Sequence, residues 1–122
     1  MNRPEDLDKD CVFCKFINGM IDRKRIVYQD DYVLAFKEEK APMAAFHVLI
    51  IPKAHIESVS KIISSNSYYI KFVYEAAAKI AKANLIDSYS VFTRTGAHAG
   101  QTVSHLHYHM ISNFQDDCIL RV

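Results

Sequence analysis

The sequence contains no tryptophan, and it has only three glycines, three prolines and three cysteines among 122 residues. No stretch approaches the roughly 18 uninterrupted apolar residues that a membrane-spanning helix needs. The charged N-terminus lacks the apolar core of a secretory signal. With 15 basic and 14 acidic side chains, there is neither a basic stripe for nucleic acid nor an acidic tail. We therefore expect a cytoplasmic protein with no nucleic-acid or membrane partner.

The few cysteines point away from disulfides. An odd number of cysteines in a cytoplasmic chain favours reduced thiols or metal ligands. Cys11 and Cys14 form a Cys-x-x-Cys pair, which is a modest sign of metal binding. The alternative is two buried cysteines near the start of a strand or helix. Cys118 has no partner motif.

The chain is long enough for one domain with a modest core. We expect a polar lead-in at residues 1–10 and a single domain at residues 11–122. The clearest element is a helix over residues 68–85, where apolar residues recur every three or four positions and charged residues take the other side. Its apolar face comprises Tyr69, Val73, Ala76, Ala77, Ile80, Ala81 and Leu85.

The other predicted elements are strands, identified by β-prone or nearly continuous apolar runs. They lie at residues 26–29, 32–36, 46–51, 89–94 and 104–112. The first two are joined at Asp30-Asp31, which predicts a hairpin. Because most of the five strands are neighbours in sequence, they indicate an antiparallel sheet with the helix packed on one face, an α+β fold.

Three of the six histidines occupy alternate positions, at His105, His107 and His109. Alternate residues of a strand share one face, so these three would lie opposite Leu106, Tyr108 and Met110. A row of histidines could be a solvated strand face or a metal-binding pair. It could also hold a nucleophile whose neighbours fix its tautomer and receive charge.

The loop before the histidines favours the nucleophile. Gly96 and Gly100 let the backbone approach an anion and present N–H groups to phosphate oxygens, and Gln101 and Thr102 add neutral donors. A phosphate-binding loop beside a histidine nucleophile suggests phosphoryl or nucleotidyl transfer. His98, in the same loop, is more typical of a solvated side chain.

Residues 99–111, Ala-Gly-Gln-Thr-Val-Ser-His-Leu-His-Tyr-His-Met-Ile, resemble the signature of the histidine triad (HIT) family. The segments at 11–17, 34–36 and 47–55 resemble further blocks of that family, in the same order. The likeness points to the Hint branch and its bacterial-type relatives with an N-terminal Cys-x-x-Cys. It implies an antiparallel sheet with a long helix, and a homodimer whose sheet is continuous across the interface.

The resemblance also implies an activity. A HIT enzyme of this branch cleaves purine nucleoside 5′-phosphoramidates or related adenylylated compounds. His107 would attack the α-phosphorus and form a nucleotidyl-histidine, from which water releases the nucleoside monophosphate. Two alternatives stay open. One is a dinucleoside polyphosphate hydrolase on the same scaffold, and the other is a zinc-stabilised nucleotide-binding or interaction module with little turnover.

For the reacting phosphate, the resemblance implies supporting roles around His107. His109 and His47 would stabilise the phosphate and the charged imidazole, and the backbone around His105 would fix the tautomer. Gln101 and Thr102 would hold phosphate oxygens. Thr102 would also lie near the departing group.

For the nucleoside, the resemblance implies that Ile17 and Phe36 sandwich the base. Glu38 would bind the ribose hydroxyls, although the family commonly has Asp there and this chain has one extra residue before His47. Arg94 stands where the family often has Asn. It would either contact the phosphate or face away.

For the metal, relatives with the cysteine pair imply a structural zinc bound by two cysteines and two histidines. The two histidines that match are the one after Pro-Lys-Ala and the first of the triplet. The expected ligands are Cys11, Cys14, His55 and His105. Four nitrogen and sulfur ligands make a closed site that would stabilise the fold and take no part in the reaction.

Overall fold

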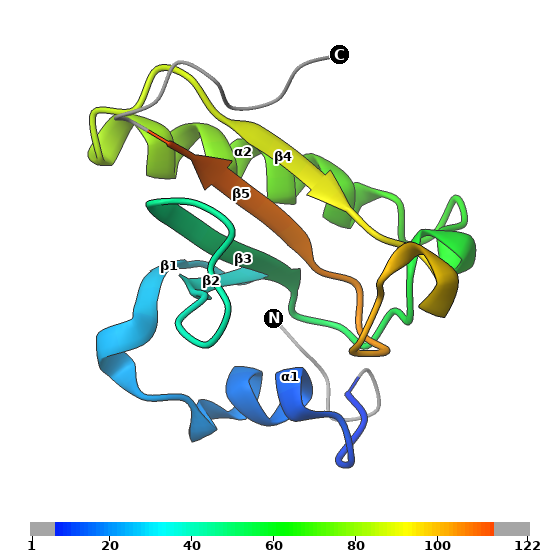
Figure 1. Cartoon of the computed structure of the whole chain (residues 1–122). Coiled ribbons are helices and arrows are strands. Elements are labelled where there is room, and N and C mark those ends of the chain that lie inside the picture. The colour runs from blue at the N-terminus through cyan, green and yellow to red at the C-terminus, as the bar shows by residue number, and fades with distance from the viewer. Residues whose placement is uncertain (1–6, 114–122) are drawn as a thin grey trace.

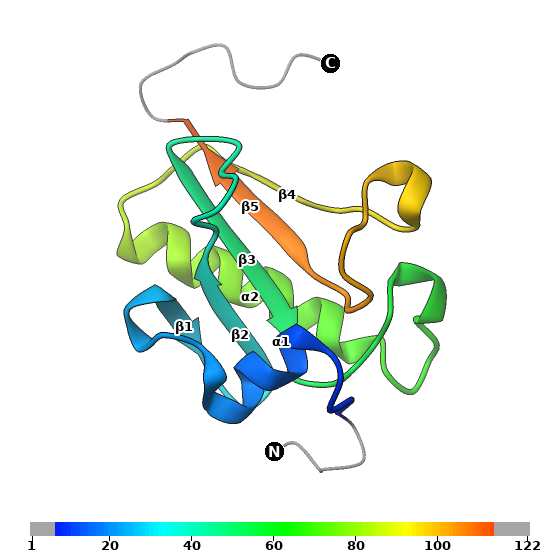
Figure 2. The ribbon, with the colours of Figure 1, turned by 60° about the horizontal axis from the view of Figure 1, so that its bottom comes forward.

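The structure is a computed structural model that describes residues 7–113. Five antiparallel strands form one sheet in the order β1-β2-β3-β5-β4. The strands are β1 (Ile26–Gln29), β2 (Val33–Lys37), β3 (Phe46–Pro52), β4 (Ser90–Thr93) and β5 (Tyr108–Ser112). The long helix α2 (Tyr68–Ala83) covers one face of the sheet, and α1 (Val12–Lys15) lies on the opposite side (Figures 1 and 2). The α+β fold with a five-stranded antiparallel sheet and a long helix is confirmed.

The predicted hairpin is confirmed, because β1 and β2 pair antiparallel on either side of Asp30-Asp31. Asp30 organises the turn. Its Oδ1 accepts hydrogen bonds from the backbone N–H groups of Tyr32 and Val33 at 2.8 and 2.9 Å. Its Oδ2 accepts one from the Tyr28 hydroxyl at 2.7 Å. These bonds supply the local partners that a tight turn needs.

The core between α2 and the sheet contains six of the seven residues predicted for the apolar face of the helix, all except Leu85, together with Leu106, Tyr108 and Met110 from the histidine segment. The helix ends two residues earlier than predicted, at Ala83. Leu85 adopts a positive φ of 56° and is 93% exposed, so it leaves the apolar face. The left-handed backbone at Leu85 stops the helix although the apolar periodicity continues to that position.

A second core lies on the other face of the sheet, where no helix was predicted. Here α1 and the short helical segment η2 (Phe16–Met20) pack against β2 and β3. Phe13 of α1 is buried with Leu34, Phe36 and Leu49. This layer carries the Cys-x-x-Cys pair to the end of the sheet where the histidine segment enters it.

The final strand is shorter than predicted. It begins at Tyr108 instead of residue 104, and the chain bends at residues 103–105. The backbone N–H of Leu106 donates to the carbonyl of Ile56 at 2.6 Å, outside the sheet ladder. His105 therefore lies off the strand, His107 directly precedes it, and only His109 belongs to it. The prediction of one continuous histidine strand was wrong at its N-terminal half.

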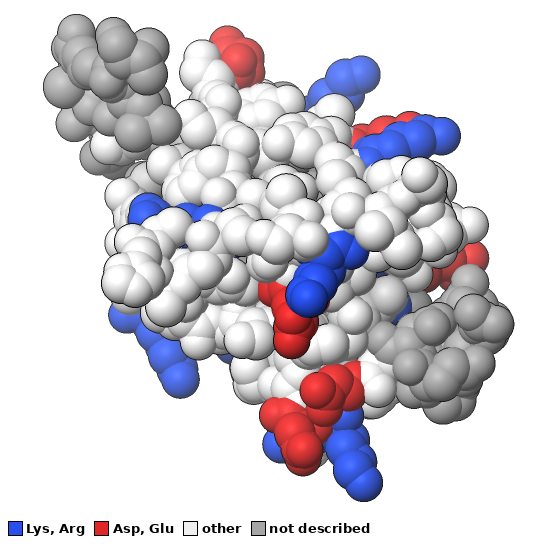
Figure 3. Space-filling model, turned by 90° about the vertical axis from the view of Figure 1, so that its right-hand side faces the viewer, with Lys and Arg blue, Asp and Glu red and all other residues white. Residues whose placement is uncertain are grey.

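No helix in the described part of the chain is long and apolar enough to cross a membrane. On the face drawn in Figure 3, cationic and anionic side chains are interspersed and separated by wide uncharged areas. That face carries no continuous basic surface.

Candidate active site and metal centre

His107 is held as a neutral imidazole with one free nitrogen. Its side chain is only 7% exposed, and burial lowers its pKa from the ordinary value. Its Nδ1 lies 2.7 Å from the backbone carbonyl oxygen of His105. A carbonyl can only accept, so Nδ1 carries the hydrogen and the lone pair is on Nε2. The edge contact with the Phe13 ring, at 5.2 Å between centroids, holds the plane of the imidazole.

A second chain of hydrogen bonds fixes His47 and His109. The backbone N–H of Met43 donates to His47 Nδ1 at 3.0 Å, so His47 carries its hydrogen on Nε2. That Nε2 lies 2.9 Å from His109 Nδ1, which must accept. A neutral His109 therefore carries its own hydrogen on Nε2. One backbone N–H thus determines the tautomers of two imidazoles.

Burial keeps these imidazoles uncharged near neutral pH. Burial, followed by the nearby His107, His47 and Arg94, lowers the pKa of His109 to about 4. Burial also lowers the pKa of His47. The His107 and His109 rings lie 5.3 Å apart. The site therefore places a free imidazole lone pair next to an imidazole N–H donor, an arrangement suited to attack on phosphorus and to binding its oxygens.

The glycine loop is held by Gln101. Its Oε1 accepts from the Gly96 N–H at 2.8 Å, and its Nε2 donates to the carbonyls of Glu57 and Val103 at 2.7 and 2.9 Å. Both polar atoms of the side chain are therefore engaged with backbone. Thr102, next in the chain, is exposed. The assignment of both residues to phosphate oxygens stays a prediction.

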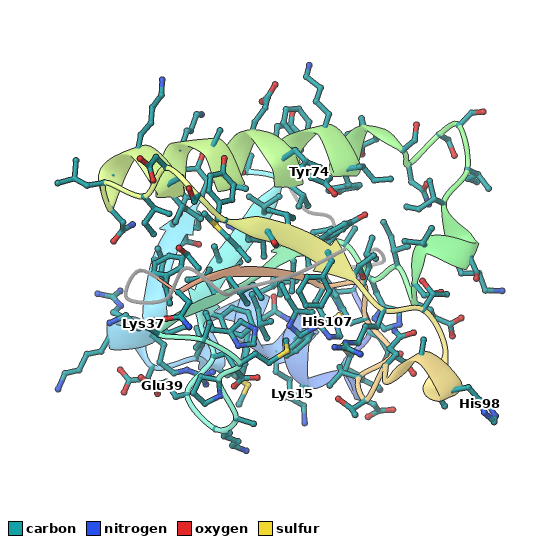
Figure 4. All side chains as sticks on the ribbon, turned by 45° about the horizontal axis from the view of Figure 1, so that its top comes forward. Lys15, Lys37, Glu39, Tyr74, His98 and His107 are labelled. Atoms are coloured by element: carbon teal, nitrogen blue, oxygen red, sulfur yellow. The ribbon has the colours of Figure 1, made fainter. Side chains whose placement is uncertain are left out.

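Two other residues of the histidine region take clear positions. His98 is exposed at the tip of the loop and points away from His107 (Figure 4). The exposed Arg94 contacts two loops: its Nη1 donates to the carbonyl of Ala99 at 3.2 Å, and its Nη2 lies 4.0 Å from Met43 Sδ. Arg94 therefore connects the glycine loop with the loop of Met43, whose backbone N–H fixes the tautomer of His47.

Two cavities are lined by residues that were predicted to bind the nucleoside. An open cavity of about 700 Å³ is lined by Glu38 and His47 and also by Ala83 and Asn84 at the end of α2, and the assignment of Glu38 to the ribose stays a prediction. A smaller cavity of about 180 Å³ is lined by Phe16, Ile17 and other mainly apolar residues. Phe36 is only 1% exposed, so Phe16 and not Phe36 is the ring that this cavity exposes to a ligand. The role of Phe36 in binding a base stays a prediction.

Arg25 was not foreseen as part of this region. Its guanidinium carbon lies 5.6 Å from the centroid of the Phe16 ring and 5.4 Å from that of Phe36. Its Nη2 donates to the carbonyl of Lys37 at 2.9 Å, and it pairs with Glu39 at 3.5 Å. Nothing in the local sequence predicts this contact, because it joins the short helical segment Arg23–Arg25 to Lys37 at the end of β2.

The four predicted metal ligands come together. The ligand atoms of Cys11, Cys14, His55 and His105 all lie within 4.8 Å of one another. The Sγ–Nδ1 distances are 3.3 Å for Cys11–His105, 3.4 Å for Cys14–His55 and 3.5 Å for Cys14–His105. Tetrahedral zinc with bonds of about 2.3 Å to sulfur and about 2.0–2.1 Å to nitrogen separates such atoms by about 3.6 Å. The donor set and its spacing fit a tetrahedral metal ion.

The surroundings of the cluster orient its ligands for a cation. His105 Nε2 lies 3.1 Å from the carbonyl of Pro52, so the hydrogen is on Nε2 and the Nδ1 lone pair faces the sulfurs. Asp8 donates its backbone N–H to Cys14 Sγ at 3.3 Å, and its carboxylate lies 3.9 Å from His55 Nε2. Burial raises the pKa of Cys14 to about 12. Burial thus disfavours the Cys14 thiolate, and a bound divalent cation would offset this effect by stabilising the negative charge.

The chain matches the family described as "Scavenger mRNA decapping enzyme C-term binding" over residues 10–121. It is 36% identical to the purine nucleoside phosphoramidase of Escherichia coli K12 over 105 residues, which cover 84% of this chain and 87% of that protein. It is 33% identical to an adenylylsulfatase of Arabidopsis thaliana over 117 residues, covering 93% of this chain and 57% of the relative.

A solved HIT family hydrolase from Clostridium thermocellum has the same fold. It superposes with a TM-score of 0.85 at 39% identity, and the match covers 94% of this chain and 98% of that one. The matching fold, the spaced histidines and the sequence identity agree with one another. This chain belongs to the histidine triad (HIT) family.

Proposed function

We propose that this protein hydrolyses purine nucleoside 5′-phosphoramidates or related adenylylated compounds through a nucleotidyl-histidine intermediate. The observation that carries the proposal is the bond from His107 Nδ1–H to the carbonyl of His105. It leaves the Nε2 lone pair of a buried, neutral imidazole available to attack phosphorus. The phosphoramidase name of the Escherichia coli relative supports the same reaction class.

In this reaction His107 Nε2 displaces the amine from the α-phosphorus, and water then displaces His107 and releases the nucleoside monophosphate. The Nε2–H group of His109 would donate to a phosphate oxygen. The positive charge formed on His107 would be stabilised by the carbonyl of His105, which already accepts from its Nδ1. Splitting one hydrolysis into two in-line displacements is the benefit that a histidine nucleophile offers.

The test is hydrolysis of adenosine 5′-monophosphoramidate, followed by release of AMP. His107→Ala should lower kcat/KM by about 10³-fold or more, because the covalent route is lost. His98→Ala is the matched control, since it removes an exposed histidine that points away from the site. Intact-protein mass spectrometry after rapid acid quench should detect an adenylyl group on the wild type only. Equal activity of wild type and His107→Ala would refute the mechanism.

We also propose that Cys11, Cys14, His55 and His105 bind a zinc ion and that its role is structural. Four nitrogen and sulfur ligands without a carboxylate favour zinc among the common divalent ions. All four positions of a tetrahedron are filled by protein. No coordination position is then left for substrate.

A homodimer is proposed from the family resemblance and is consistent with the sheet order. β4 is an edge strand, so its outer backbone groups can pair with a second copy. Tyr89, just before it, is 40% exposed. Light scattering of the purified protein measures the mass directly, and a monomeric mass at micromolar concentration would contradict this proposal.

A further inference from the structure

We propose that Arg94 makes this site selective for substrates whose leaving group is an oxyanion, such as sulfate or a phosphate chain, over those that release a neutral amine. The inference rests on the proposed transfer of a nucleotidyl group to His107. It specifies the class of adenylylated compound that the reaction favours.

Within the described part of the chain, the charge of Arg94 is not balanced by a neighbour. Across residues 7–113, no carboxylate forms an ion pair with its guanidinium. Its polar contacts are with neutral acceptors, the carbonyl oxygen of Ala99 and the sulfur of Met43. A guanidinium has five N–H donors, so most of them are available to an anionic group.

The Phe92 ring connects Arg94 with the histidine cluster. It follows β4 two residues after Phe92, and its guanidinium carbon lies 5.5 Å from the centroid of the Phe92 ring. The Phe92 ring stacks on His109, with 4.9 Å between centroids and 15° between planes. The charge of Arg94 is one of the causes that lower the pKa of His109. The electric field of Arg94 therefore reaches the imidazole that would contact the phosphate.

The glycine loop fixes the position of this cation. A Cβ atom on Gly100 would lie 3.2 Å from Arg94 Nη1 and 3.3 Å from its Cδ, so the arginine packs directly on the glycine. Gly100 also has a φ of +97°, which disfavours any side chain there. Arg94 thus contacts both the loop of Gly100 and the loop of Met43, and these contacts favour one position of its guanidinium before a ligand binds.

The chemistry of the two kinds of leaving group differs in charge. When His107 attacks adenosine 5′-phosphosulfate, the P–N bond forms as the P–O bond to sulfate breaks, and sulfate departs with the electron pair as a dianion. Water then displaces His107 and yields AMP and a proton. An amine instead takes up one proton from water as the P–N bond to it breaks and leaves uncharged, and the second step returns that proton to the solvent. A fixed cation stabilises the charge that develops on the departing oxyanion and gives no such advantage to a neutral amine.

The test compares three substrates with one nucleoside: adenosine 5′-phosphosulfate, diadenosine triphosphate and adenosine 5′-phosphoramidate. For Arg94→Asn, kcat/KM for an oxyanion leaving group should fall about tenfold more than kcat/KM for the phosphoramidate. Arg94→Lys should retain part of the preference, because it keeps the charge. Lys82→Gln on the exposed side of α2 removes the same charge elsewhere and should leave the ratio unchanged. The two oxyanion substrates show whether sulfate or a polyphosphate is favoured.

A binding measurement separates this inference from the proposed function. If none of the three substrates is turned over, the proposed function fails, and calorimetry still decides the role of Arg94. The affinity for ADP relative to AMP should then fall about tenfold in Arg94→Asn. The inference is overturned if both the kinetic ratio and the ADP-to-AMP affinity ratio of Arg94→Asn equal those of the wild type.

Discussion

Single backbone groups determine which nitrogen of each active-site imidazole carries hydrogen. The carbonyl of His105 does so for His107, and the N–H of Met43 does so for His47 and, through it, for His109. The family resemblance implied the part played by the backbone around His105, whereas the Met43 N–H belongs to no motif that sequence can reveal. The histidines themselves were predictable from their spacing, but the contact of Met43 with His47 depends on how the loop between β2 and β3 folds.

The role of the Met43 N–H can be tested by removing it. Met43→Pro lacks this donor, so His47 is free to adopt the other tautomer, and we expect kcat to fall about tenfold, the value of one hydrogen bond of about 1.4 kcal/mol. Met43→Ala keeps the N–H and is the matched control. Nitrogen-15 NMR of the histidine rings should show Nε2–H for His47 in the wild type and in Met43→Ala. Observation of Nδ1–H on His47 in the wild type would rule this assignment out.

Among the secondary-structure elements, α2 and the β1–β2 hairpin were predictable because their signals are local. Apolar periodicity identifies the helix, and Asp30 with its turn identifies the hairpin. The segment containing α1 was not predicted, because it is too short for an apolar periodicity. Phe13 is buried only by its contact with the face of the sheet opposite α2. Strand β5 was predicted too long because the bend at His105 depends on segments far away in sequence. The His105 side chain contacts Cys11 and the carbonyl of Pro52, and the next backbone N–H, that of Leu106, donates to Ile56.

The loop from Gly96 to Val103 gives a prediction at this scale. Gln101→Ala leaves three backbone groups without their partner, and we expect unfolding to become easier by about 1–2 kcal/mol. Gln29→Ala is the control, because Gln29 accepts only an exposed bond from Lys53, and such surface bonds contribute little. Chemical denaturation measures both. If Gln101→Ala instead weakens AMP binding and leaves the free energy of unfolding unchanged, Gln101 binds phosphate and does not stabilise the loop.

In the whole molecule, the candidate metal site and the candidate active site share His105. Its imidazole faces the two thiols, and its carbonyl orients His107. The ligand set was predictable by resemblance, because cysteines and histidines at matching positions mark it. The resemblance also implied that the backbone of His105 orients His107, but the bend that takes His105 out of the strand was not predicted.

Removal of the metal tests this arrangement. The purified protein should contain one zinc per chain, and a strong chelator should lower its melting temperature by 10 °C or more, as expected for the loss of several kcal/mol in a small domain. Cys14→Ser should bind little zinc. Cys118→Ser, a change outside the described residues, should bind zinc normally. Full retention of zinc by Cys14→Ser would contradict the assigned ligands.

The short length of β5 has a consequence for the evolution of this active site. If the ladder continued back through residue 105, the carbonyl of His105 would be available for pairing with a neighbouring strand, in competition with His107. Because the strand starts at Tyr108, this carbonyl remains available to His107. If His107 is the nucleophile as proposed, a substitution that extends the ladder would make the sheet more regular and, by the same change, slow the reaction.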